Sequence, residues 1–137
     1  MRRLVLLAPV LVMLGCDDGF TPSLSNFTFD GAARDSPTVL LLSTDFHDGD
    51  GNLGGGLLET FIDARPTGAG ALEMAPLFAQ SGLQQDATDG DLQFVLELNV
   101  NNSAAPPSGS TFKLGIRATD EDFNSSSTSE ITISISY

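Results

Sequence analysis

Apolar and polar residues alternate along much of the chain beyond residue 24, and a two-residue period of this kind predicts β-strands. The clearest case runs from Leu92 to Val100, where every even-numbered residue is apolar. The segments from Phe112 to Thr119 and from Ile131 to Ser136 alternate in the same way, so each has one apolar face. Because such a strand buries its apolar face against another layer, the pattern predicts two sheets packed together.

Three earlier segments are also predicted as strands, although their alternation is less regular: Phe27 to Phe29, Thr38 to Phe46 and Leu57 to Ala64. The stretch from Arg65 to Asp91 is broken by several glycines and prolines. This stretch is compatible with a short edge strand or with a helical turn. Pro76 argues against a central strand there, because proline cannot donate to a sheet ladder.

Turn sequences separate the predicted strands, among them Asp48-Gly49, Asp89-Gly90 and Pro107-Ser108-Gly109. Strands that recur without intervening helices favour antiparallel sheets over a parallel sheet. Six strands and one uncertain strand within roughly a hundred residues are typical of immunoglobulin-like domains. The predicted fold class is therefore all-β, an antiparallel immunoglobulin-like β-sandwich of about seven strands. A small barrel is the alternative, because it would show similar alternation.

The first sixteen residues have a different pattern. Arg2 and Arg3 precede an apolar run from Leu4 to Leu14, which is too short to cross a bilayer as a helix and predicts a secretion signal. The run ends in Met13-Leu14-Gly15-Cys16, which resembles the lipobox of bacterial lipoproteins. The resemblance implies that the signal is cleaved before Cys16 and that lipid is attached to the Cys16 thiol.

This resemblance divides the chain into residues 1–15 as signal peptide, 16–23 as lipidated cysteine and tether, and 24–137 as the folded domain. It implies a bacterial envelope lipoprotein that is anchored in a membrane and faces the periplasm or the cell surface. An ordinary signal peptide with an unrelated cysteine is the alternative. Cys16 is the only cysteine, so the domain has no disulfide of its own and depends on packing for stability.

The predicted domain is strongly acidic. All 18 carboxylates follow Cys16, against four basic residues, which leaves a net charge of about −14. Such a domain is repelled by nucleic acid and by anionic lipid head groups. We therefore expect no nucleic-acid partner. The predicted location in the cell envelope implies an unidentified envelope protein or glycan as the partner.

Oxygen ligands are concentrated in the turn after the second predicted strand. Calcium prefers carboxylate and amide oxygens, which Asp45, Asp48, Asp50 and Asn52 supply at short spacing. An EF-hand is not predicted, because Leu53 stands where that loop requires glycine and the flanks read as strands. The segment from Asp48 to Asn52 instead resembles the DxDGN turns of bacterial immunoglobulin-like and cadherin-like modules.

A second similarity lies at the end of the sixth predicted strand, where Ala118-Thr119-Asp120 resembles the AxD segment of the same modules. In an immunoglobulin-like sandwich, the loops after the second and sixth strands lie at one end. The resemblance therefore implies a calcium site, for which the candidate ligands are Asp45, Asp48, Asp50, Asn52, Asp120 and Asp122.

Asp86, Asp89 and Asp91 would join this group if the uncertain stretch supplies a strand. The cadherin linker motif DxNDNxP is absent, so calcium binding between domains is not expected. The alternative is that these Asp, Asn and Gly residues only form turns, for which their side chains and backbones are suited.

The sequence does not predict catalytic chemistry. His47 is the only histidine, and it has no second imidazole for a zinc site and no nucleophile motif such as GxSxG. The chain has no Trp and one Tyr, which leaves little surface for stacking sugars and disfavours a carbohydrate-active enzyme. We expect a non-enzymatic binding or adhesion module at the cell envelope. The alternative is a structural or assembly lipoprotein that has no metal site and whose partner docks on a sheet edge or face.

Overall fold

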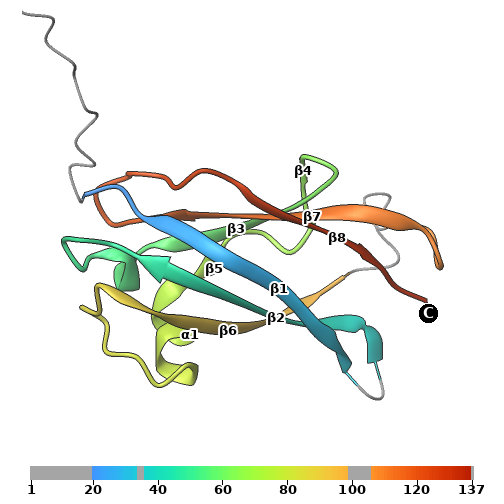
Figure 1. Ribbon diagram of the computed structural model, residues 1–137, viewed down its shortest axis with the longest axis horizontal. Coiled ribbons are helices and arrows are strands. Elements are labelled where there is room, and N and C mark those ends of the chain that lie inside the picture. Colours follow the sequence, from blue (N-terminus) through green and yellow to red (C-terminus); the bar gives the residue numbers. More distant parts are fainter. Residues whose placement is uncertain (1–19, 34–35, 99–105, 137) are drawn as a thin grey trace, which may run out of the picture.

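The computed structural model describes residues 20–33, 36–98 and 106–136, with the side chains of residues 36 and 37 left out. The predicted signal peptide, Cys16 and Val100 lie outside these ranges. The described residues form two facing sheets of antiparallel strands (Figure 1). Their strands are β1 Ser23–Ala33, β2 Ser36–His47, β3 Leu57–Ile62, β4 Arg65–Pro66, β5 Leu72–Glu73, β6 Asp89–Glu97, β7 Thr111–Thr119 and β8 Ser129–Ser134.

The strand order identifies the topology. The first sheet has the order β1-β2-β6, and the second has the order β4-β3-β7-β8. The short strand β5 also pairs with β3. The chain therefore crosses between sheets after β2, returns before β6 and crosses again before β7, as in immunoglobulin-like sandwiches. The predicted all-β fold class is confirmed.

The core lies between the two sheets and is built by the alternation seen in the sequence. In β2 and β6 the even-numbered residues point inward, so Leu42 and Phe94 are buried while Leu41 and Val95 are exposed. Within the first sheet, Phe27 of β1 stacks on Phe94 of β6, with ring centroids 6.5 Å apart. The other large and fully buried side chains are Phe78, Leu40, Leu42, Leu53, Leu58, Met74, Leu92, Leu96, Leu114 and Ile116.

The uncertain stretch contains both of the structures that its sequence allowed. Two short edge strands, β4 and β5, precede the helix α1, Met74–Gln80. Pro76 lies in the first turn of that helix, where a missing N–H costs no hydrogen bond. Helix α1 is far shorter than a membrane span, and no other helix in the described ranges is long and apolar enough to cross a bilayer.

Helix α1 covers part of the free edge of the first sheet. The side-chain amide of Gln80 donates to the backbone oxygen of Gln93 at 2.8 Å, and the backbone N–H of Gln93 donates to Ser81 Oγ at 2.9 Å.

Gly90 was predicted to form a turn with Asp89, but that prediction is wrong, because both residues begin β6. At Gly90 a Cβ would lie 3.0 Å from the ring of Phe46, so glycine permits close packing there.

Strand pairing brings several chain segments to one end of the sandwich, at the left of Figure 1. Ser23 at the start of β1 pairs with His47 at the end of β2, and His47 also pairs with Asp89 at the start of β6. In the second sheet, Leu57 at the start of β3 pairs with Thr119 at the end of β7. We call this region, made of the turns 48–56, 84–88 and 120–128, the loop end.

Candidate cation site at the loop end

Asp48 continues the inward-facing positions of β2 and is fully buried. Its Oδ2 accepts a hydrogen bond from the backbone N–H of Leu53 at 2.7 Å, and its own N–H donates to the backbone oxygen of Thr88 at 2.7 Å. Its other carboxylate oxygen, Oδ1, is buried and has no hydrogen-bond partner among the described residues. A buried carboxylate oxygen without a partner is costly unless something else satisfies it.

Asp50 and Asp120 approach the carboxylate of Asp48. One oxygen of each of the three side chains lies within 4.8 Å of the others. Calcium binds oxygens at about 2.3–2.6 Å, so two of its ligands can be separated by at most about 5 Å. The spacing of the three oxygens is therefore compatible with a shared calcium ion.

Asp120 is held in place by the turn that follows β7. Its Oδ1 accepts the backbone N–H of Asn124 at 2.8 Å, and its Oδ2 accepts the side-chain amide of Asn124 at 3.0 Å. The backbone N–H of Asp120 in turn donates to the backbone oxygen of Asn124 at 3.0 Å. Each carboxylate oxygen has more than one lone pair, so these bonds orient Asp120 and leave it able to bind a cation.

Asn52 joins the two turns. Its side-chain amide nitrogen donates to Asp50 Oδ2 at 3.2 Å and to Asp122 Oδ2 at 2.9 Å. Its amide oxygen is buried and, like the orphan oxygen of Asp48, has no partner in the described part of the chain. The turn after β2 therefore carries two buried oxygens that lack hydrogen bonds, both from residue types that ligate calcium.

The local electrostatics disfavour the charge on Asp48. Burial raises the pKa of Asp48, and the nearby carboxylate of Asp50 raises it further. The hydrogen bond from the Leu53 N–H opposes this shift but does not reverse it. A cation bound beside the three carboxylates would favour the charged form of Asp48.

Glycines let the turns of the loop end approach one another closely. A Cβ at Gly54 would lie 2.0 Å from the backbone oxygen of Gln85, and one at Gly56 would lie 2.0 Å from the backbone oxygen of Thr119. The run of three glycines from Gly54 to Gly56 is the signal in the sequence for this close approach, which was not predicted. These glycines seat the turn after β2 between the other two turns.

Not every candidate ligand lies in the cluster. Asp48, Asp50 and Asp120 converge, and Asn52 and Asp122 adjoin them through hydrogen bonds. The structure places Asp45 elsewhere, on the outer face of the first sheet, where its Oδ2 accepts the side-chain amide of Asn26 at 2.6 Å.

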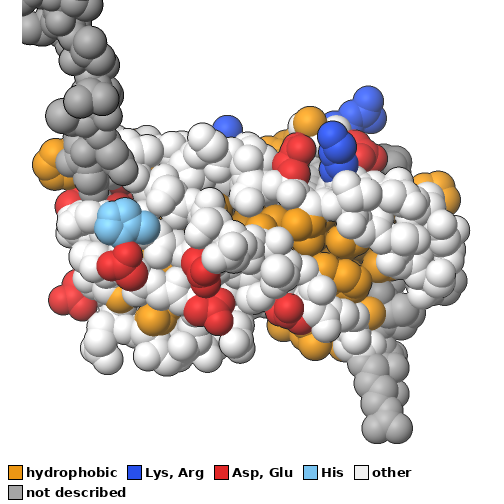
Figure 2. Space-filling view, in the orientation of Figure 1, with side chains coloured by type: hydrophobic (Ala, Val, Ile, Leu, Met, Phe, Trp, Pro, Cys, Tyr) orange, Lys and Arg blue, Asp and Glu red, His pale blue; other side chains and the backbone are white. Residues whose placement is uncertain are grey.

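Asp89 and Asp91 lie on that same outer face. Asp91 pairs with Asp45 across the strands, and Asp89 pairs with His47. Asp89 shares a side-chain hydrogen bond with His47 and accepts one from Thr88, and these two bonds lower its pKa. Figure 2 shows acidic side chains distributed over this face rather than gathered at one point. Asp86 remains at the loop end, where its backbone oxygen lies against Gly51.

No protein-family model, curated protein or solved structure matches this chain. Only the chain's own residues therefore indicate a function.

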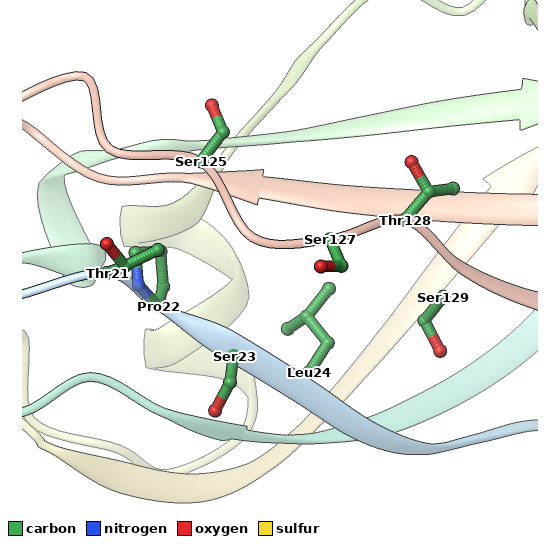
Figure 3. A pocket seen from close by; sticks show the side chains of 8 residues that line it. All are labelled: Thr21, Pro22, Ser23, Leu24, Ser125, Ser127, Thr128 and Ser129. Atoms are coloured by element: carbon green, nitrogen blue, oxygen red, sulfur yellow. The ribbon is translucent and has the colours of Figure 1, made fainter. Parts of the chain in front are cut away.

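Besides the carboxylate cluster, the surface has a pocket of about 400 Å³ between the start of β1 and the segment 125–129 (Figure 3). Its polar lining consists of hydroxyl groups, and the side chain of Leu24 rises from β1 toward Ser127.

A second pocket, of about 390 Å³, lies on the outer face of the first sheet. Leu41 and Val95 contribute apolar surface to it, and Asp30 is its one acidic residue. Neither pocket pairs two carboxylates, which glycoside hydrolysis requires.

Proposed function

We propose that this chain is a non-enzymatic, lipid-anchored binding or adhesion module of the bacterial cell envelope, with a calcium ion bound at its loop end. The observation that carries the calcium site is the buried Asp48 Oδ1, which has no hydrogen-bond partner among the described residues and belongs to a cluster of three carboxylates. An acidic cluster alone is common on surfaces. A buried oxygen left unsatisfied inside such a cluster favours a bound cation, because the cation offsets both the burial and the repulsion.

In this proposal Asp48, Asp50 and Asp120 bind the ion, and Asn52 turns its amide oxygen to it. Calcium takes six to eight oxygen ligands, and water or a partner completes the shell. The ion connects the turn after β2 to the turn after β7. It thereby stiffens a loop surface of the kind that immunoglobulin-like domains use for binding.

The lipid anchor rests on the resemblance of Met13-Leu14-Gly15-Cys16 to a lipobox. Lipid on Cys16 would hold the acidic domain at a membrane that its own charge repels. The non-enzymatic character rests on the sequence, in which His47 has no second imidazole for a zinc site and no nucleophile motif such as GxSxG.

A structural or assembly lipoprotein without a metal site is the second candidate. The observation that favours it is Asp120, whose two carboxylate oxygens already accept hydrogen bonds from Asn124. In that case Asp48, Asp50 and Asn52 serve only to shape turns.

Thermal unfolding of the purified mature protein in calcium, in magnesium and in chelator distinguishes the two candidates. A site with calcium at a hundred times its dissociation constant adds about 2.7 kcal/mol to the free energy of unfolding. We expect a rise of several degrees in Tm with calcium and a smaller rise with magnesium, which demands stricter octahedral geometry. Identical Tm values in all three conditions would reject the calcium site and favour the assembly candidate.

A further inference from the structure

The loop end also carries exposed apolar side chains. Phe123, in the turn between β7 and β8, is 87% exposed. Leu57 at the start of β3 and Phe20 just before β1 lie beside the loop end and are exposed as well. Three of the five exposed large apolar side chains in the described residues therefore lie at the end that holds the carboxylate cluster, and the other two are Leu41 and Val95.

Phe123 is held in an unfavourable conformation for a bulky residue, with φ at 66°. Its backbone N–H donates to the backbone oxygen of Asp120 at 3.2 Å, so the turn that orients Asp120 also orients Phe123. The side chain gains little from the domain core, because it is almost fully exposed. A strained backbone that presents an exposed aromatic ring is a feature expected of a binding surface.

The chain leads to the membrane anchor from the same end. Cys16 precedes Phe20 by four residues, which span at most about 14 Å when fully extended. The root of this segment is fixed beside the Phe123 turn, because Pro22 is buried and Thr21 lines the same pocket as Ser125 (Figure 3). A lipid on Cys16 would therefore bring the loop end, rather than the opposite end of the sandwich, close to the bilayer.

The acidic residues beside Phe123 oppose such an approach to anionic lipid. Asp122 precedes Phe123 directly, and Glu121 is exposed next to it. A cation at the cluster reduces this repulsion, and calcium has room in its shell for the phosphate oxygens of lipid head groups. Asp50 is exposed, so the cluster has a side that is open to solvent.

We propose that the loop end docks on the membrane in which the lipid of Cys16 is inserted, with Phe123 entering the bilayer surface and calcium bridging the Asp48, Asp50 and Asp120 cluster to lipid phosphates. This proposal rests on the calcium site and the lipid anchor proposed above. The ligand of the open side of the site is accordingly a phosphate head group of an anionic lipid.

The absence of tryptophan from the chain makes a direct test practical. F123W and V95W each introduce a single tryptophan, the first at the loop end and the second on the outer face of β6, where Val95 is 48% exposed. Both variants are produced as the full lipidated protein, with lipid on Cys16 verified by mass spectrometry. They are reconstituted into vesicles of phosphatidylglycerol and phosphatidylcholine, with and without brominated acyl chains.

With calcium, we expect the emission of F123W to shift to the blue and to be largely quenched by brominated lipid, while V95W shows neither change. In chelator, F123W should lose both effects. Quenching of F123W that is equal in calcium and chelator would overturn the calcium bridge.

A different pattern would overturn the docking and leave the proposed function standing. In that case calcium raises the Tm of the protein, but F123W stays unquenched in both conditions, and the loop end faces away from the bilayer toward another partner. If calcium does not change Tm and F123W stays unquenched in both conditions, the calcium site and the docking fail together. A protein recovered without lipid on Cys16 would also overturn the docking.

Discussion

At the scale of single residues, burial rather than sequence spacing decides which carboxylates form the candidate site. Asp45, Asp48 and Asp50 lie close together in the sequence, but the strand alternation turns Asp45 to the outer face and Asp48 to the interior. Within the described ranges, Asp48 Oδ1 is buried and has no hydrogen-bond partner, while Asp45 accepts a hydrogen bond from Asn26. The two residues differ in environment and not in chemistry, so they provide a matched pair for mutation.

Asp48→Asn should have opposite effects with and without calcium. In chelator it removes a buried, uncompensated charge and keeps an oxygen for the Leu53 N–H, so we expect the free energy of unfolding to rise by roughly 1–3 kcal/mol. In calcium the variant should lose the Tm increase of the wild type. Asp45→Asn makes the same change of charge outside the cluster and should retain the calcium response. Loss of the response in both variants would contradict the assignment.

The pH dependence of stability should report the same carboxylate. Burial raises the pKa of Asp48 in the folded state above its ordinary value of 3.8. At a pH between the ordinary pKa and the raised pKa, the folded state therefore holds a proton that the unfolded state has lost. The stability of the wild type in chelator should therefore fall as pH rises through this window and stay low above it. The gap between Asp48→Asn and the wild type should widen over the same window, as measured by urea unfolding. If the difference in free energy of unfolding between Asp48→Asn and the wild type did not change with pH, the charge on Asp48 would not destabilise the folded state.

The residue types of the candidate site could be predicted from the sequence, but their final positions could not. The acidic turn was found because oxygen ligands at short spacing are conspicuous in sequence, and the Asp120 segment was found from its resemblance to the AxD segment of immunoglobulin-like and cadherin-like modules. The removal of Asp45 from the cluster depends on the phase of the β2 alternation, which places Phe46 and Asp48 on the inner face. The hydrogen bonds that Asn52 makes to Asp50 and Asp122 join two distant turns and have no signal in the sequence.

At the scale of elements, the strands follow from the local pattern, and the connections do not. Regular alternation located β6, β7 and β8, because each buries one face on a common core. The alternation is less regular in β1, β2 and β3, which were also predicted as strands. The stretch between β3 and β6 depends on tertiary contacts. Met74, Leu77 and Phe78 form the buried side of α1, a helix too short to be stable alone. Because this packing, and not the local pattern, decides the structure, the sequence of the stretch was compatible with both an edge strand and a helical turn.

Helix α1 should contribute strongly to stability despite its length. Phe78 is buried, and its ring lies 4.9 Å from the ring of Phe46 between centroids. We expect Phe78→Ala to lower the free energy of unfolding by about 3–5 kcal/mol, as large core truncations do. Phe123→Ala makes the same change at an exposed position and should shift stability by no more than about 0.5 kcal/mol. Equal losses in urea unfolding of the two variants would contradict the packing described for α1.

The glycines of the turn after β2 should be needed for both stability and calcium binding. Gly54→Ala places a Cβ against the backbone oxygen of Gln85 and should cost about 1–3 kcal/mol, while weakening calcium binding because the turns separate. Gly70→Ala is the control, since open space surrounds Gly70 and only its φ of 76° opposes a side chain. That variant should lose about 1 kcal/mol and bind calcium like the wild type, as measured by calorimetric titration. If Gly54→Ala bound calcium with unchanged affinity, close packing of the turns would not be required for the calcium site.

At the scale of the whole molecule, an acidic sandwich gathers its candidate cation ligands, its exposed Phe123 and the start of β1 at one end. The β1-β2-β6 and β4-β3-β7-β8 sheets produce this arrangement, because antiparallel pairing returns β2 and β7 to the end where β1 begins. A net charge of −12 over the full chain makes such an end difficult to bring near other anionic surfaces without a cation. The proposed binding module and its membrane docking therefore both depend on a calcium ion at Asp48, Asp50 and Asp120.

A crystal structure of the mature protein grown with calcium, with anomalous scattering data, tests that ion most directly. We expect an anomalous peak between the three carboxylates, with Asp48 Oδ1 and oxygens of Asp50 and Asp120 at about 2.3–2.6 Å from it. A structure at saturating calcium in which no anomalous peak lies at the cluster and Asp48 Oδ1 binds only water would contradict the calcium site.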